Sequence, residues 1–297
     1  MDSPIQQDES ALPRLDVNQA QERPSRHDEW AHSTPTVLQI PQWSAEEWLV
    51  HGFSTRFGGV SEIAGAARSR GDLNLGFTNR DTAEAVLLNR ERFIGFVVPP
   101  GSESSWGLVT LKQMHSSLVR RVGRAEIAER ASLWGDGLLT NEPGVLLGIQ
   151  TADCLPILIA DRTRRAVGAF HAGWRGTLKG IVEQGVAAMG REFGSNPKDL
   201  VAGIGPGIGQ CCFAVGAEVR DLFRARYQYS DKLFAEGQTL SLDLVEANCR
   251  QLLTAGLNPE AISTLNACTS CRTDEFFSYR AERGKTGRLM AMIGVAA

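Results

Sequence analysis

Three side chains that commonly bind metal ions are spaced along the middle of the chain. His115 follows an apolar run that ends at Leu111, Cys154 lies 39 positions later between two apolar runs, and His171 closes the next run, Ala166 to Phe170. Two imidazoles and a thiolate suit zinc, and three protein ligands leave a fourth position for water or substrate. Water bound there would lose its proton near neutral pH and become a nucleophile.

Spacing alone leaves two other interpretations of these residues open. Cys154 equally suits a buried core thiol, with His115 and His171 hydrogen-bonded in loops, because the three form no short metal-binding repeat. Beside Asp153, Cys154 is also a candidate thiolate nucleophile whose pKa a metal or an imidazolium would lower. The sequence does not separate a ligand from a nucleophile.

Several polar loops are candidates for the rest of a site. Arg56 precedes two glycines, and Arg175 precedes a helix expected from Leu178, so either arginine could hold an anion together with backbone N–H groups. Asn74 could read a ribose hydroxyl or an amide, although turn formation explains this asparagine and Arg56 about as well. Tyr279 and Arg280 follow an aromatic run and are expected to reach the pocket, as is Gln113 beside His115. A zinc-centred pocket bordered by these loops is therefore the working hypothesis.

Two glycine motifs and a group of cysteines have ordinary explanations. The segment 203–209 fails the dinucleotide fingerprint because Ile208 stands where the third glycine is needed, and Gly284-Lys285-Thr286 fails the P-loop pattern because Tyr279 replaces its first glycine. The pairs Cys211-Cys212 and Cys268/Cys271 could form a second metal site with four thiolates. One CxxC with a vicinal pair is weak support, and packed thiols are the simpler interpretation.

The pattern of apolar runs predicts a mixed α/β (α+β) architecture. The expected strands are Gly144 to Ile149, Leu155 to Ala160, Ala166 to Phe170, Leu200 to Ile204 and Leu289 to Val295. The expected helices are Thr82 to Ile94, Leu178 to Phe193, Gly216 to Tyr227 and Leu242 to Ala255, the last capped by Ser241 or Asp243. The strands are almost uninterruptedly apolar, which indicates sheets that are covered on both faces.

The length and composition of the chain limit the class of protein to which it can belong. The 297 residues suffice for one large domain at 37–297 preceded by a disordered polar tail at 1–36, and a net charge of −3 argues against nucleic acid as a partner. The start of the chain lacks a secretory signal and no long apolar stretch follows, so a cytoplasmic protein without a membrane partner is expected. Six cysteines in such a chain suit a reducing compartment. Monomer and homodimer both remain open.

A series of motifs, taken in order, resembles one protein family. The motifs are Thr55-Arg56-Phe57-Gly58-Gly59-Val60-Ser61, Leu73-Asn74-Leu75-Gly76, Gln113-Met114-His115, Gly135-Asp136-Gly137, Thr151-Ala152-Asp153-Cys154-Leu155-Pro156, His171-Ala172-Gly173-Trp174-Arg175-Gly176, Gly205-Pro206 and Phe277-Ser278-Tyr279-Arg280. They resemble the laccase-domain family of bacterial YfiH-like proteins, which carries both polyphenol oxidase and purine nucleoside phosphorylase labels. The likeness runs from about Val37 to Ala297.

The resemblance implies a single compact layered domain with mixed β-sheets flanked by helices. It also implies a zinc site formed by His115, Cys154 and His171, with copper as the less favoured ion. The family is associated with phosphorolysis of adenosine, inosine and methylthioadenosine, and with adenosine deamination. Its small-molecule partners are accordingly a nucleoside and phosphate.

The candidate roles differ between the reactions that the family suggests. In phosphorolysis, Arg56 or Arg175 would hold phosphate behind the anomeric carbon. In deamination, a carboxylate such as Asp153 would move protons while activated water attacks the purine. An amidase acting on a peptidoglycan precursor and a zinc-ordered binding module without catalysis are the alternatives. True laccase chemistry is disfavoured because the chain has only five histidines.

Overall fold

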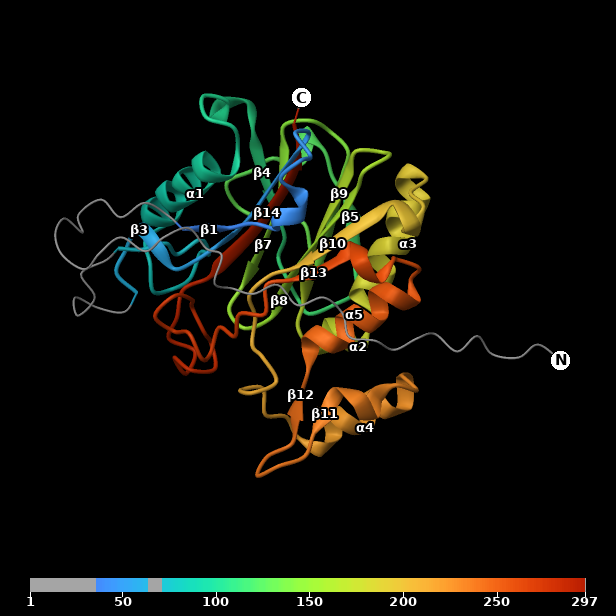
Figure 1. Cartoon of the computed structure of the whole chain (residues 1–297). Coiled ribbons are helices and arrows are strands. Elements are labelled where there is room, and N and C mark those ends of the chain that lie inside the picture. Colours follow the sequence, from blue (N-terminus) through green and yellow to red (C-terminus); the bar gives the residue numbers. More distant parts are fainter. Residues whose placement is uncertain (1–35, 64–70, 297) are drawn as a thin grey trace.

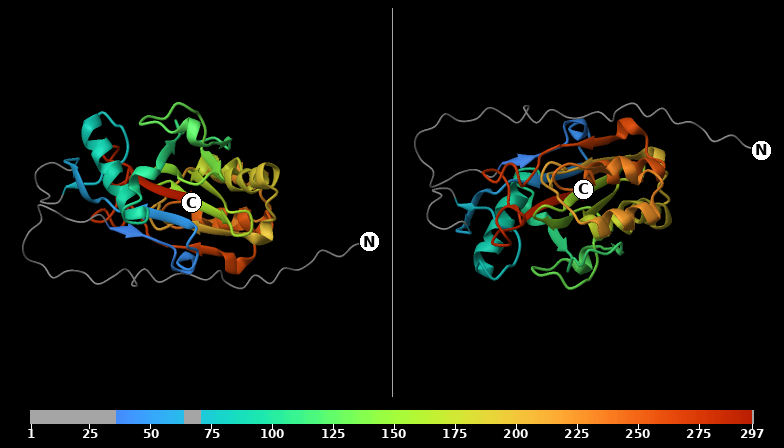
Figure 2. Two further views of the ribbon diagram at one scale, coloured as in Figure 1. Left: turned by 90° about the horizontal axis from the view of Figure 1, so that it is seen from above. Right: turned by 90° about the horizontal axis from the view of Figure 1, so that it is seen from below.

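The computed structural model describes residues 36–63 and 71–296. Almost all of the expected polar tail at 1–36 therefore lies outside the described residues. The described part forms four layers, which Figure 1 and the two views of Figure 2 show as one helix, two β-sheets and a second group of helices. This is the mixed layered α+β domain that the sequence predicts.

The first sheet has five strands and carries one long helix on its outer face. Its order is β1 (Val37–Leu38), β2 (Leu49–Ser54), β14 (Leu289–Val295), β7 (Val145–Thr151) and β4 (Gly107–Thr110). All neighbours are antiparallel except β7 and β4, which are parallel. Helix α1 (Ala83–Val97) packs through Phe93 and Val97 against Leu146 and Met292 of this sheet.

The second sheet has six strands and is covered by helices from the second half of the chain. Its order is β13 (Ile262–Thr264), β10 (Leu200–Ile204), β8 (Leu155–Asp161), β9 (Ala166–Ala172), β6 (Gly137–Thr140) and β5 (Val119–Arg121). Helices α2 (Trp174–Leu178), α3 (Ile181–Phe193) and α5 (Leu244–Thr254) pack on its outer face. Helix α4 (Ala217–Arg226) and the hairpin of β11 (Phe234–Ala235) and β12 (Ser241–Leu242) lie at the lower end in Figure 1.

Strand β8 shows why the central strands are apolar throughout. Ile157 and Ile159 face the helices, whereas Leu158 and Ala160 face the other sheet, and all four are completely buried. Because successive side chains point to opposite faces, a strand between two apolar layers needs apolar residues at every position. The predicted coverage of both faces is confirmed.

The predicted elements match the structure closely, with one correction. The helix expected over 178–193 is divided: α2 begins earlier, and Gly180 adopts a left-handed conformation (φ 75°) before α3 begins. Such a φ is open to glycine and ends a helical run. Of the two caps considered for α5, Asp243 is the one observed, because its carboxylate accepts a hydrogen bond from Glu246 N at 2.9 Å.

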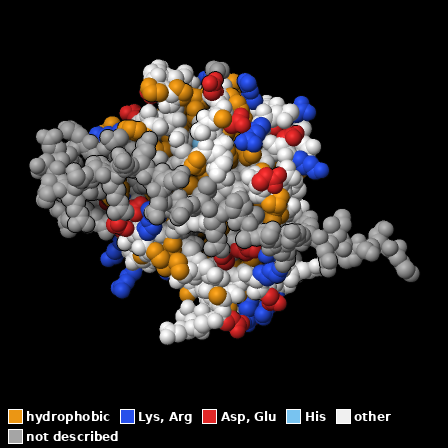
Figure 3. Space-filling model, viewed as in Figure 1, with side chains coloured by type: hydrophobic (Ala, Val, Ile, Leu, Met, Phe, Trp, Pro, Cys, Tyr) orange, Lys and Arg blue, Asp and Glu red, His pale blue; other side chains and the backbone are white. Residues whose placement is uncertain are grey.

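The charged surface and the length of the helices give no indication of a nucleic-acid or membrane partner in the described part of the chain. On the face shown in Figure 3, acidic and basic side chains are interspersed over the described surface. Among residues 36–63 and 71–296, every helix is too short or too polar to span a lipid bilayer.

A buried histidine in β2 is expected to make stability depend on pH. His51 Nε2 accepts a hydrogen bond from Ile40 N at 2.8 Å, and burial lowers the pKa of His51 to about 4. Because the unfolded pKa is near 6.5, the folded state binds the proton less well, and stability present above about pH 6.5 is lost as pH falls toward 4. We expect the free energy of unfolding to fall by about 2 kcal/mol between about pH 7.5 and about pH 5 through this residue.

Denaturant unfolding at the two pH values measures this effect. The control variant His51→Gln offers an acceptor that does not titrate, and it should lose correspondingly less stability over the same interval. An equal pH dependence in both proteins would show that His51 does not contribute.

Candidate metal centre

The two strands β8 and β9 bring together two of the three expected ligands. Cys154 immediately precedes β8, and His171 lies near the end of β9, where it is paired with Pro156. His115 reaches the same place from the loop that follows β4, with its Nε2 3.9 Å from Cys154 Sγ. One ligand atom from each of the three residues lies within 4.8 Å of the others, so they could share one metal ion.

The surrounding backbone allows this close approach. The rings of His115 and His171 are 4.8 Å apart and meet edge to face. Gly173 lies against them, and a Cβ at that position would be 2.7 Å from Cys154 Sγ. Any larger residue would therefore push the ligands apart. His115 itself has a left-handed backbone (φ 58°), an uncommon conformation that its neighbours must stabilise.

Asp136 stabilises both histidines with one carboxylate. Its Oδ1 lies 2.8 Å from His171 Nδ1, which leaves Nε2 of that ring to face the cluster. The same carboxylate accepts hydrogen bonds from the backbone N–H groups of Met114, His115 and Ser116 at 2.6 to 3.3 Å. No local pattern predicts a role for Asp136, although it stands within the motif Gly135-Asp136-Gly137. It fixes the loop that carries one ligand and the ring of another.

The residues of the cluster shift one another's pKa values, because they pair a thiol with imidazoles and a carboxylate. Burial alone would raise the pKa of Cys154, but His171 and His115 lower it to about 6. Burial would lower the pKa of His171, but Cys154 and Asp136 raise it to about 9. Burial would raise the pKa of Asp136 too, yet its hydrogen bonds to His171 and Ser116 hold it well below its ordinary value. The two imidazoles thus favour the thiolate form of Cys154, which is the form that binds metal ions, whereas His171 must release its proton before Nε2 can bind one.

Removing the charge of Asp136 is expected to weaken metal binding. The variant Asp136→Asn keeps the size of the side chain but loses the anion beside His171 Nδ1. Loss of such a partner typically lowers metal affinity by about 10-fold to 100-fold. Competition with a chelator of known affinity measures the change. An unaltered zinc affinity in a folded variant would contradict the assigned role.

Asp153 is not one of the three clustered residues, and its side chain holds the turn that precedes Cys154. Its carboxylate accepts hydrogen bonds from Thr269 Oγ1 at 2.7 Å, Ser278 Oγ at 2.7 Å and Arg280 N at 2.6 Å. Like His115, Asp153 has a left-handed backbone (φ 86°). Because three donors already occupy this carboxylate, it is engaged with the protein, which does not fit the proton transfer expected from the sequence.

Arg56 is buried instead of lying on an open loop. Its side chain has no exposed surface, and it forms ion pairs with Asp72 at 3.1 Å and Glu282 at 3.2 Å. It also donates to Thr273 O at 2.7 Å and lies 4.5 Å from the centre of the Phe277 ring. The expectation that Arg56 binds an anion does not fit this arrangement, because its charge is already compensated inside the protein.

Asn74 and Gln113 are also engaged with the protein itself. Asn74 has no exposed surface, donates to Asp81 and Gly76, and accepts from Arg288 N. Gln113 forms a pair of hydrogen bonds with the backbone of Gln150 on β7, at 2.7 and 2.9 Å. Both amides therefore fix the loops around the centre.

Three other expected residues reach the surface. Tyr279 is 56% exposed. The exposed Arg280 donates to the carbonyl groups of Cys212 and Ala214. Arg175 is exposed on α2, with its guanidinium 4.2 Å from the centre of the Trp174 ring.

Two cations near the cluster were not found from the sequence. Lys179 Nζ donates to His115 O at 3.3 Å. Arg288 is close enough for Cys154, Asp153 and Tyr279 to oppose the lowering of its pKa by burial. No motif marks either residue in the sequence. Lys179 lies at the end of α2 and Arg288 directly before β14, and neither neighbourhood suggests a binding site.

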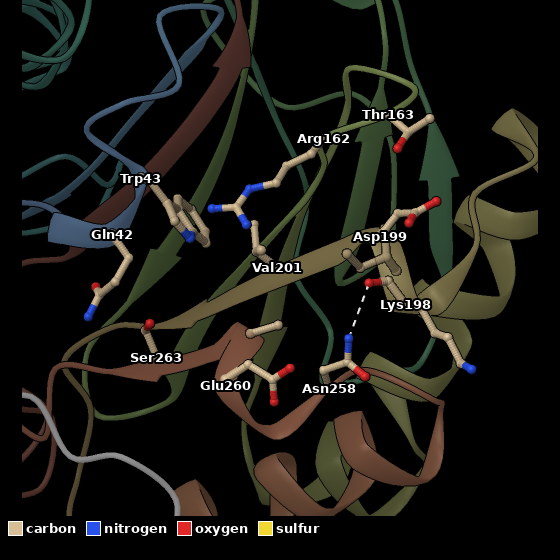
Figure 4. Close-up of a pocket in the computed structure, with 12 residues that line it drawn as sticks. Gln42, Trp43, Arg162, Thr163, Lys198, Asp199, Val201, Asn258, Glu260 and Ser263 are labelled. Carbon is tan, nitrogen blue, oxygen red and sulfur yellow. Dashed lines mark hydrogen bonds between the residues drawn. The ribbon is translucent and has the colours of Figure 1, made fainter.

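A cavity of about 380 Å³ lies apart from the centre. It is lined by Trp43 of the short helix η3 (Pro41–Trp43), by Arg162 after β8, and by residues such as Lys198 and Glu260. Figure 4 shows Asn258 in this cavity with its amide directed at the carbonyl of Lys198. Cys154 immediately precedes β8, whereas Arg162 immediately follows it. The cavity therefore lies at the end of β8 opposite to the metal cluster. It contains none of the expected site residues.

The family called multi-copper polyphenol oxidoreductase laccase matches residues 50–296. This range contains all three candidate ligands and Asp136, and it covers more than half of the chain. The chain belongs to this family.

Individual relatives extend over nearly the whole chain. Purine nucleoside phosphorylase YlmD of Bacillus subtilis is 34% identical over 277 residues, which cover 89% of this chain and 96% of that protein. Purine nucleoside phosphorylase YfiH of Escherichia coli is 33% identical and covers 86% and 98%. The crystal structure of the hypothetical protein YfiH of Bacillus licheniformis is 34% identical, with a TM-score of 0.78 and coverage of 88% and 97%. The crystal structure of YlmD from Geobacillus stearothermophilus, 32% identical, also has a TM-score of 0.78 and covers 89% and 97%.

Proposed function

We propose that this chain is a zinc-dependent purine nucleoside phosphorylase. It would convert adenosine, inosine or methylthioadenosine and phosphate to the free base and a ribose 1-phosphate. The observation that carries the proposal is the cluster of His115, Cys154 and His171, found in a chain whose near full-length relatives bear that name. The particular nucleosides are those that the family resemblance suggests.

The donor set fits a catalytic zinc ion. Two imidazoles and one thiolate are typical ligands of zinc, and three protein ligands leave a position for a fourth group. When bound, the ion would act as a Lewis acid that polarises a group on the substrate. Asp136 would orient the His171 imidazole that holds the ion, and the absence of a side chain at Gly173 leaves room for the Cys154 thiolate.

We assign substrate contacts to the cationic and exposed groups around the cluster. Lys179, Arg175 and Arg288 are the candidates for holding phosphate, since a phosphate requires positive charge or N–H donors. Tyr279 and the exposed Arg280 are candidates for contacting the nucleoside.

The other residues expected in the site are proposed to position neighbouring loops and side chains without touching the substrate. Arg56, Asn74, Gln113 and Asp153 are positioning residues, because their polar atoms are engaged with other protein groups.

Adenosine deamination by the same centre is a second candidate activity. The fourth position of a zinc site can also hold water that attacks a purine, and the observation in favour is again the three-ligand cluster. The deaminase and the phosphorylase differ in their need for phosphate. Ammonia release without phosphate would identify deamination.

Product analysis tests the proposal directly. Purified zinc-loaded protein is incubated with adenosine or inosine, with and without inorganic phosphate, and the products are separated by chromatography. We expect free base and ribose 1-phosphate in equal amounts only when phosphate is present. Addition of a strong chelator should stop the reaction, and zinc should restore it.

Two other results would overturn the proposal. Cleavage of a UDP-linked muropeptide without any nucleoside turnover would identify the amidase that the sequence analysis left open. Stabilisation of the fold by zinc, without turnover of either substrate, would identify a binding module.

A further inference from the structure

Four cysteines that the proposed phosphorylase site does not use form a second cluster. Cys211 and Cys212 follow the loop after β10, and Cys268 and Cys271 follow β13. Their four Sγ atoms lie within 4.8 Å of one another, and Cys271 Sγ is 3.5 Å from that of Cys211 and 3.3 Å from that of Cys212. For a zinc ion with bonds of about 2.3 Å to each sulfur, a tetrahedron requires sulfur separations of about 3.8 Å. The observed cluster is close to this size.

The backbone around the cluster has the features of a metal-binding turn. Cys268 Sγ accepts hydrogen bonds from the backbone N–H groups of Gly209, at 3.2 Å, and Cys271. These donors would compensate negative charge on a bound thiolate. A side chain at position 209 would crowd the cluster, because a Cβ there would lie 3.3 Å from Cys211 Sγ and from the Cβ of Cys268.

The two loops that carry the thiols are held together independently of the sulfur atoms. Gly207 and Cys268 form a parallel β-bridge, and Thr269 N donates to Gly207 O at 3.0 Å. The cation of Arg280 is bound to the carbonyl groups of Cys212 and Ala214. The thiols are therefore placed by the fold, with a positive charge beside them.

We propose that Cys211, Cys212, Cys268 and Cys271 form a structural zinc site with four thiolate ligands. Four protein ligands complete a tetrahedron, so this site has no position for a substrate, in contrast to the cluster of His115, Cys154 and His171. Each thiol releases one proton to solvent as its bond to zinc forms. The exposed Cys211 and Cys271 give the ion a route from solvent.

The four-cysteine site is connected to the cluster of His115, Cys154 and His171 through hydrogen bonds to Asp153. Thr269 lies between the ligands Cys268 and Cys271, and its hydroxyl donates to Asp153 beside Cys154. Ile208 N, from the other cysteine loop, donates to the carbonyl of Asp153 at 2.7 Å. Zinc would thus fasten together the two loops that hold the turn of the catalytic cluster.

Counting metal ions in the full-length protein tests this inference without relying on nucleoside turnover. Protein prepared with reductant, loaded with zinc and freed of excess metal should hold two ions per chain. The double variant Cys211→Ser/Cys271→Ser changes two exposed side chains and should hold one. The variant Cys154→Ala should also hold one, and the control Cys249→Ala, a buried cysteine outside both clusters, should hold two.

Cobalt separates the two sites by their ligands. A centre with four thiolates gives more intense thiolate-to-cobalt charge-transfer absorption than one with a single thiolate. The intense bands should persist in Cys154→Ala and disappear in Cys211→Ser/Cys271→Ser. A cysteine double variant that still holds two ions would overturn the proposal. So would a reduced wild-type protein that binds one ion and leaves four reactive thiols, or a disulfide of Cys271 that forms in the presence of zinc.

Discussion

Replacing Cys154 by alanine is expected to lower kcat/KM for phosphorolysis by about a thousandfold. A Lewis acid stabilises a transition state by several kcal/mol, and about 4 kcal/mol corresponds to about a thousandfold in rate. Cys154 contributes the only sulfur among the three candidate ligands, so its loss removes the soft donor of the centre. Initial rates with inosine and phosphate, measured together with zinc content, give the comparison.

The same variant separates the two roles that the sequence left open for this cysteine. If Cys154→Ala loses both the zinc ion and turnover, Cys154 is a ligand. If it retains the ion with unchanged affinity but loses turnover, Cys154 is a nucleophile. The matched control Cys249→Ala removes a thiol that lies in the core on α5 and should preserve the activity. Full activity in Cys154→Ala would refute any catalytic function of the cluster.

Replacing Arg56 by methionine is expected to destabilise the protein by about 3 to 5 kcal/mol. The substitution leaves Asp72 and Glu282 without the buried cation that lies 3.1 and 3.2 Å from them, and it removes the hydrogen bond to Thr273 O. Breaking one side of a buried ion pair is costly because the remaining charge is desolvated. Equilibrium unfolding in denaturant measures the loss.

The control for Arg56 is an ion pair on the surface. Arg121 lies 3.4 Å from Glu192 with 52% of its side chain exposed, so Arg121→Met should cost about 1 kcal/mol or less. A phosphate-binding role for Arg56, as expected from the sequence, would show a different pattern. Arg56→Met would then unfold no more easily than Arg121→Met, while KM for phosphate would rise.

The central strands could be predicted from the sequence because their environment leaves a local signal. In β7, β8, β9 and β14, every or almost every residue is buried between two layers, so each strand is a continuous apolar run. Edge and peripheral strands leave no such signal. β5 ends in two exposed arginines, and β3 (Phe57–Ser61) contains two glycines, so neither resembles a buried strand.

The candidate site could be predicted only where the side chain itself shows the chemistry. Histidine and cysteine at strand ends indicate a metal site, and the pairing of β8 with β9 follows from a short turn between two apolar strands. The burial of Arg56 depends on Glu282, which is 226 positions away, and no local pattern reports such a partner. Asp136 was missed for the same reason, because its role arises from contacts with His171 and with the backbone at 114–116.

The hydrogen bonds of Asp136 would have a consequence for which metal the candidate centre binds. Since they fix the ring of His171 and the backbone that carries His115, the ligands would stay in place in the folded chain while one ion is exchanged for another. Nitrogen and sulfur donors bind divalent copper more tightly than zinc, so geometry and availability decide the occupant of such a centre. The supply of metals in the cell or in the purification buffer would then decide which ion occupies it. Copper found in a preparation of the protein would reflect the metals to which it had been exposed. It would not by itself identify an oxidase.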